Sequence, residues 1–291
     1  MPQTARPFCA EISRDSGEEI GATASRVDHW LLVEYRGLWG HDAVSSSGLS
    51  DQVKASLREQ KAELPHSKVL FIRRRERRRA DGIAVFYARS SIDGVELRGA
   101  ELDGYAELAD LDLADLEAPP MPHPVFLVCT HGKHDRCCAR YGRPLHDALH
   151  EQADEGWVWQ STHVGGDRFA GNVVVLPQGL YYGRVSTGDA WPLLDEHLNG
   201  RIYLERFRGR SAYPMAVQAA DIEIRRVTGL AGIDDLSLEE IERRGDAWAV
   251  RFSTIRGESY EVAVVAAAGE LTYLTCSATA LRHPRRYVAT T

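Results

Sequence analysis

Three of the five cysteines in this chain of 291 residues, Cys129, Cys137 and Cys138, lie in one short segment. His163 and Asp167 follow in the sequence HVGGD, after a gap long enough for a helix. Thiolate, imidazole and carboxylate groups are all metal ligands in proteins. Closely spaced cysteines, odd in number, are more typical of metal or redox chemistry than of a secreted disulfide framework. We therefore expect the chemistry of this chain to lie within residues 125–185.

The spacing of the cysteines suits a loop around a metal. Cys129 ends a strand that reads as buried, and the next eight residues, THGKHDRC, lead to the Cys137–Cys138 pair. Gly132 allows the backbone to approach a metal centre closely, so that loop amides could hydrogen-bond to its sulfur ligands. Successive side chains diverge, so we expect one centre to use mainly one cysteine of the pair.

The HVGGD segment supplies the second half of the predicted site. A spacing of four would place His163 and Asp167 on one face if the chain turns helical at the double glycine. Gly166, Arg168 and Asn172 are near enough in sequence to support a ligand through hydrogen bonds. The predicted donors, two sulfurs, one nitrogen and one oxygen, are Cys129, Cys138, His163 and Asp167.

The surrounding pattern predicts an α/β protein in three parts. Residues 1–118 form an N-terminal α/β lobe, with strands at 30–37, 68–74, 83–89 and 94–102, a helix after Ser50, and a linker beginning at 108. Residues 119–210 alternate strands and helices in the order that a thioredoxin-like domain needs. Residues 211–291 add a helix and a β-hairpin with strands at 246–254 and 259–267.

Composition excludes several classes of protein. With 44% hydrophobic and 26% charged residues the chain reads as an ordinary globular protein. The net charge of -7 and the pI near 5.9 argue against a nucleic-acid binder. The N-terminus has no signal-peptide pattern, and no run has the length of a membrane span. We expect a cytoplasmic protein with no membrane or nucleic-acid partner.

A basic run, RRRERRR, occupies residues 73–79 between two predicted strands. Such a run is typical of a solvated strand end or loop. It would also suit a docking patch for an acidic redox partner, because local charge steers encounter even on an acidic protein.

The segments CTHGKHDRCCARYG and STHVGGDRFAGNVVVLPQGLYYGRV resemble the sucrase/ferredoxin-like family of thioredoxin-like 2Fe-2S proteins. The resemblance implies a cluster held by two cysteines and two histidines. Carried over by position, it assigns Cys129 and Cys138 as the cysteines and His163 as the first histidine of His-x-Gly-Gly-His. Asp167 stands where the family has its second histidine, which leaves the fourth ligand open.

Three explanations compete for the fourth ligand. Asp167 binds iron through oxygen, which we favour, or the site has lost its cluster, or another side chain takes the place. The candidates for that side chain are His131, His134, Cys137 and Cys276.

The resemblance implies an electron-transfer protein that carries a 2Fe-2S cluster, exchanges electrons with a reductase or oxidase, and turns over no substrate of its own. Two alternatives stay open. A thiol-disulfide oxidoreductase would use the same scaffold, although the chain has no Cys-x-x-Cys and a disulfide between neighbouring cysteines would be strained. A structural zinc site would also suit two sulfurs, one nitrogen and one oxygen.

Overall fold

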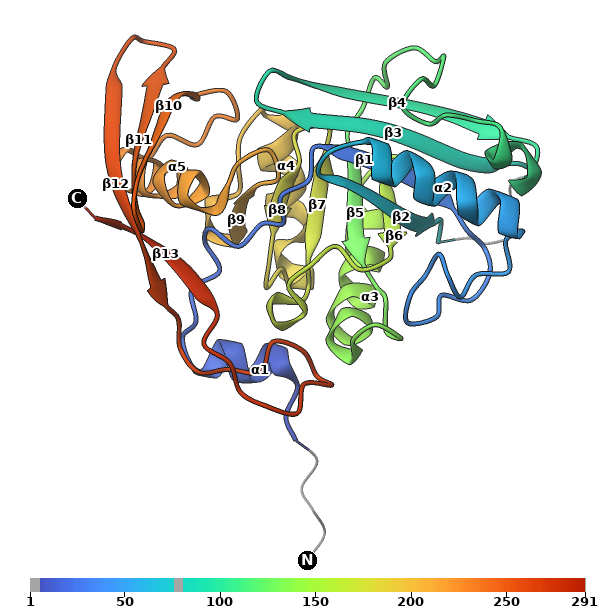
Figure 1. The fold of residues 1–291 in the computed structure, drawn as a ribbon, viewed down its shortest axis with the longest axis horizontal. Helices are drawn as coiled ribbons and strands as arrows, with labels where there is room; N and C mark the ends of the chain where they lie inside the picture. Colours follow the sequence, from blue (N-terminus) through green and yellow to red (C-terminus); the bar gives the residue numbers. More distant parts are fainter. Residues whose placement is uncertain (1–5, 76–80, 291) are drawn as a thin grey trace, which may run out of the picture.

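The computed structural model of the chain describes residues 6–75 and 81–290. Nine strands form one mixed sheet in the order β4-β3-β1-β2-β6-β5-β7-β8-β9 (Figure 1). Their bounds are β1 His29–Glu34, β2 Ser67–Arg73, β3 Ile83–Ser91, β4 Gly94–Leu102, β5 Val125–Cys129, β6 Val158–Ser161, β7 Val173–Leu176, β8 Leu180–Tyr182 and β9 Phe207–Arg210. The helices are α1 Cys9–Asp15, α2 Asp51–Glu63, α3 Arg136–His150, α4 Ala190–Leu198 and α5 Met215–Thr228.

The strands of the first 118 residues form one half of this sheet. β1 runs parallel to β2 and antiparallel to β3, and β4 pairs with β3 at the edge. The predicted strands and helix of this region are confirmed, and the Ser50 hydroxyl caps α2 by accepting a hydrogen bond from the Val53 amide at 3.3 Å. β2 also pairs antiparallel with β6, so the α/β lobe and the central strands share one sheet.

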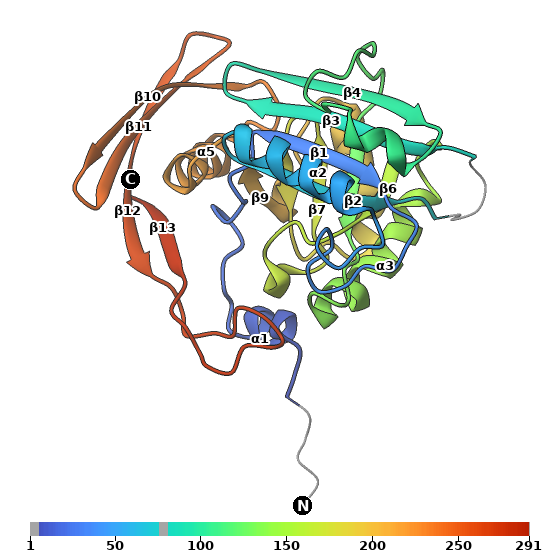
Figure 2. The same ribbon diagram turned by 45° about the vertical axis from the view of Figure 1, so that its right-hand side comes forward.

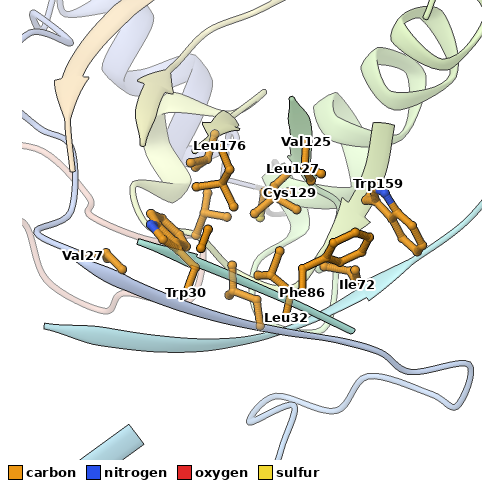
Figure 3. Packing of buried hydrophobic residues seen from close by; sticks show 14 of the residues in the cluster. Val27, Trp30, Leu32, Ile72, Phe86, Val125, Leu127, Cys129, Trp159 and Leu176 are labelled. Atoms are coloured by element: carbon orange, nitrogen blue, oxygen red, sulfur yellow. The ribbon is translucent and has the colours of Figure 1, made fainter. Parts of the chain in front are cut away.

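β5 is the central strand on which the predicted site depends. It runs parallel to β6 and antiparallel to β7, and all five of its residues are buried. Figure 3 shows one face of the sheet here, where Leu127 and Cys129 of β5 lie in a cluster with Trp30, Phe86 and Trp159. This packing fixes the end of β5, and therefore the start of the loop that leads to α3.

The C-terminal part differs from the expected hairpin. The predicted pair is present as β11 Ala247–Thr254 and β12 Ser259–Ala268, but β10 Leu236–Arg244 and β13 Arg285–Thr290 extend it to a four-stranded antiparallel sheet. β10 is rich in charged residues and largely exposed, so it lacks the apolar alternation that marks a half-buried strand. α5 covers one face of this sheet (Figure 1).

Helix α1 and the loop that precedes β13 lie together beside α3. Figures 1 and 2 both show the red loop that precedes β13 lying around α1, below the start of α3. Within residues 6–75 and 81–290, no helix is long and apolar enough to cross a membrane.

Residues 76–80 of the basic run lie outside the described residues. Of its described part, Arg73 is buried, and its guanidinium donates to the Gly37 carbonyl at 2.6 Å and lies over the Trp39 ring. Arg75 pairs with Asp147 and Glu151 of α3.

Candidate metal centre

The structure brings Cys129, Cys138 and His163 together at the end of β5. Cys129 is the last residue of the strand, and Cys138 lies in the first turn of α3. One donor atom from each of these three residues lies within 4.8 Å of the others. The Asp135 side chain caps α3 by accepting a hydrogen bond from the Cys137 amide at 2.8 Å, which sets the direction in which the cysteine pair leaves the loop.

Asp167 joins the same group. The Nδ1 atom of His163 lies 3.0 Å from its Oδ1 atom, and the Cys138 thiol donates to that oxygen at 3.3 Å. The helical turn expected at the double glycine is absent. Gly165 and Gly166 have φ values of 118° and 81°, and the short 3-10 helix begins only at Asp167. A left-handed turn, open to glycine at low cost, therefore brings His163 and Asp167 together.

The ionisable groups of this mixed-donor site, Cys129, Cys138, His163 and Asp167, perturb one another. The hydrogen bond from Cys138 lowers the pKa of Cys129, and the same contact raises the pKa of Cys138. Burial alone would lower the pKa of His163, but the carboxylate of Asp167 and the thiolate of Cys129 raise it to about 9. Cys129 and Asp167 therefore carry negative charge, whereas Cys138 and His163 hold protons that metal binding would release.

A buried arginine, which sequence reasoning missed, braces this site. Arg208 is 1% exposed and its guanidinium donates to the Gly165 carbonyl at 3.1 Å, to Asn172 Oδ1 at 2.8 Å and to the Thr23 carbonyl at 2.6 Å. Burial lowers its pKa to about 10. Arg208 lies on β9, and no local pattern in the sequence connects it with the double glycine.

Lys68 of β2 is a second cation beside the site. Its partly buried side chain donates to the Val164 carbonyl at 2.7 Å, and burial lowers its pKa to about 8. Among the described residues, neither Lys68 nor Arg208 forms an ion pair with a carboxylate. Two cations without a carboxylate ion pair of their own among the described residues therefore lie beside the mixed-donor site.

The residues predicted to support the ligands through hydrogen bonds have different roles in the structure. Asn172 donates to the Gly166 carbonyl at 2.8 Å, so both residues hold the HVGGD turn. The Gly132 amide donates to the Thr130 carbonyl at 2.9 Å, and the backbone contact to the Cys129 sulfur comes from His131. Arg168 points away and pairs with Glu18 at 2.8 Å.

The side chains that were alternatives to Asp167 as the fourth ligand have different contacts and lie in different places. The His134 ring stacks on His163 with centroids 3.9 Å apart, and its Nε2 atom lies 3.8 Å from Asp167 Oδ2. His131 contacts the Gly40 carbonyl through Nε2 at 2.6 Å. Cys137 and Cys276 lie in another sulfur group, with Cys9, so His134 is the nearest competitor of Asp167.

A model of the sucrase/ferredoxin-like family matches residues 20–209, which include all four residues of the mixed-donor site. The chain belongs to the sucrase/ferredoxin-like family. A curated relative, altered inheritance of mitochondria protein 32 from Meyerozyma guilliermondii, is 31% identical over 105 residues. That alignment spans 33% of this chain and 37% of the relative, so it covers little more than a third of the relative's length.

Solved structures similar to this sucrase/ferredoxin-like protein include the thioredoxin-like [2Fe-2S] ferredoxin from Aquifex aeolicus. It is 22% identical, with a TM-score of 0.27, and the match covers 30% of this chain and 91% of the ferredoxin. A cysteine-to-serine variant of the same ferredoxin matches with 22% identity and a TM-score of 0.26, over 29% of this chain and 97% of the variant.

Proposed function

We propose that this chain is an electron carrier whose mixed-donor site holds a 2Fe-2S cluster in a thioredoxin-like domain. The observation that carries the proposal is the convergence of Cys129, Cys138, His163 and Asp167 at the end of β5, in a member of the sucrase/ferredoxin-like family. Two thiolates with an imidazole and a carboxylate suit iron in such a cluster. When bound, the cluster supplies a one-electron couple.

The charge around the site supports an anionic cluster. An oxidised 2Fe-2S core carries about +2, so two thiolates, one carboxylate and a neutral imidazole bring the total to about -1. A buried cation is costly unless an opposite charge lies near it. Arg208 and Lys68 lie beside the site without a carboxylate ion pair of their own among the described residues, and an anionic cluster would offset their burial.

His163 offers the route for electrons to leave. Its side chain is 20% exposed, and the ring of His134 that stacks on it is 28% exposed. A groove next to the Thr130–Gly132 turn is lined by Arg73, Arg75, Lys133 and three arginines of α3. We infer that an acidic redox protein docks there. Its rate of electron exchange should fall as salt rises, and a salt-independent rate would argue against this groove.

A single zinc ion in the mixed-donor site is the second candidate. The observation that favours it is compactness, because Cys138 Sγ lies only 3.9 Å from His163 Nδ1 and 3.3 Å from Asp167 Oδ1. Such a group of four donors suits tetrahedral zinc. The metal content of the purified protein decides between zinc and iron.

The test is anaerobic purification of the full chain, followed by its visible spectrum and its iron, sulfide and zinc contents. We expect a coloured protein with about two irons and matching sulfide per chain. Asp167→Ala should lose most of the iron, whereas His134→Ala should keep it. Iron-free wild-type protein would refute the proposal, and iron lost only in His134→Ala would reassign the fourth ligand.

A further inference from the structure

A second group of sulfur atoms lies on the other side of the start of α3. The Sγ atom of Cys137 is 3.5 Å from that of Cys9 and 3.3 Å from that of Cys276, and Cys276 is 3.6 Å from Cys9. All three side chains are buried. These residues come from α1, from α3 and from the C-terminal loop, so three distant parts of the chain place one thiol each at a single point.

The distances match a metal site more closely than a disulfide. Bonded sulfurs lie about 2.05 Å apart, so none of the three pairs is joined. Around tetrahedral zinc, a bond length of about 2.3 Å places two sulfurs about 3.8 Å apart. The observed separations of 3.3 to 3.6 Å need an expansion of only a few tenths of an ångström to reach that value.

Asp135 adds a buried carboxylate to the group. Its side chain is 3% exposed, and both of its oxygens lie 4.0 Å from the Cys9 sulfur. They accept hydrogen bonds from the amides of Cys137 and Cys276 at 2.8 and 2.6 Å, which leaves a lone pair on each oxygen. Asp135 has no ion-pair partner among the described residues, although a buried carboxylate normally has a cation near it.

Backbone contacts favour thiolates at this point. The backbone of Ala10 hydrogen-bonds to Cys137, and that of Cys9 hydrogen-bonds to Cys276. Amide contacts of this kind orient thiolate ligands and stabilise their charge. Three buried thiols in an apolar core would need no such contacts.

We infer that Cys9, Cys137 and Cys276 bind a zinc ion, with Asp135 at the fourth position. Soft thiolates select zinc over hard cations such as magnesium and calcium, and four closed protein positions are typical of a structural rather than a catalytic zinc. Cys9 and Cys276 lie outside the residues 20–209 that match the family, whereas Cys137 and Asp135 lie within them. The inference does not depend on the 2Fe-2S cluster.

The zinc would fasten α1 and the loop that precedes β13 to α3, the helix that carries Cys138. The loop around α1 in Figures 1 and 2 already lies where this contact is needed. Arg6 holds the same loop by donating to the carbonyls of Cys276 and Ala278, and its guanidinium lies over the Tyr273 ring. Loss of the ion should therefore loosen the C-terminal loop before it affects the nine-stranded sheet.

The experiment compares the untagged full chain with Cys276→Ser and Cys129→Ser, each produced with zinc and iron present. We expect about one zinc per wild-type chain, at least a tenfold loss of zinc in Cys276→Ser with iron unchanged, and the reverse in Cys129→Ser. A far-UV circular dichroism spectrum equal to that of the wild type shows that Cys276→Ser is folded, whether or not iron is bound. X-ray absorption at the zinc edge of the wild-type protein should show three sulfur neighbours at about 2.3 Å, and this measurement needs no variant.

Several results would overturn the inference. These are wild-type protein without zinc, zinc that persists in Cys276→Ser, or zinc that disappears in Cys129→Ser and so belongs to the mixed-donor site. An intact mass lower by two hydrogen atoms would show a disulfide in place of the metal. Loss of iron alone from the wild-type protein would refute the proposed function and leave the zinc site standing.

Discussion

Two groups of metal-binding side chains meet at neighbouring cysteines of α3, and they differ in their donor atoms and in their surroundings. Cys138 belongs to the mixed-donor site, whereas Cys137 belongs to the three-cysteine site of Cys9, Cys137 and Cys276. They lie side by side in the first turn of α3, where successive residues leave a helix in different directions. One helix end can therefore serve two centres without sharing a ligand.

The difference in donors matches a difference in surroundings. The mixed-donor site has a partly exposed imidazole and two nearby cations, so it suits a group whose charge changes as an electron arrives. The three-cysteine site is closed by α1 and the C-terminal loop, and the carboxylate of Asp135 lies beside it. Such a site suits an ion of fixed charge, which holds the chain together and exchanges no electrons.

The largest expected effect tests whether the two centres are separate, by making the same substitution at two neighbouring residues. Cys138→Ser should lose nearly all iron and keep zinc, whereas Cys137→Ser should lose nearly all zinc and keep iron, because each removes one thiolate from a different centre. Metal analysis of the two purified variants checks this. If both substitutions remove the same metal, the two groups form one centre and the comparison fails.

Much of the mixed-donor site could be predicted from the sequence, because its residues come in two short segments at the ends of neighbouring strands. The three-cysteine site could not, since Cys9 and Cys276 lie 128 and 139 residues from Cys137, and no local pattern links them. Arg208 was missed for the same reason. The outer strands β10 and β13 were missed because their charged residues hide the alternation of a strand.

Acid release of metal offers a second way to compare the two centres, because protons displace metal from thiolates. The stability of the fold itself also depends on pH. His197 of α4 is 8% exposed, and burial lowers its pKa to about 4. Between pH 6.5 and 4 the unfolded chain therefore binds a proton that the folded chain does not, so stability falls as the pH falls. The loss is about 3 kcal/mol, and His197→Leu should remove it.

Denaturant unfolding of metal-free protein from pH 7 to pH 4 measures this loss. The free energy of unfolding should fall less steeply with acid in His197→Leu than in the wild type, whatever the absolute stability of the variant. Equal slopes would assign the acid sensitivity to another group. With the slope known, acid release of zinc can be compared with acid release of iron at a pH where the fold is intact.

The smallest expected effect concerns Lys68 and Arg208, the two cations that lie beside the mixed-donor site. Lys68→Met removes a positive charge beside the proposed cluster, so the reduced, more negative state loses stabilisation and the reduction potential should fall by some tens of millivolts, roughly 1 kcal/mol. Lys61→Met, which removes an exposed lysine at the end of α2, is the matched control and should leave the potential unchanged. Zinc content should be the same in both variants, because Lys68 faces the Val164 carbonyl and has no contact with the three-cysteine site. An equal shift in the two variants would mean that the reduction potential follows the net charge of the protein. The position of Lys68 beside the mixed-donor site would then not set the potential.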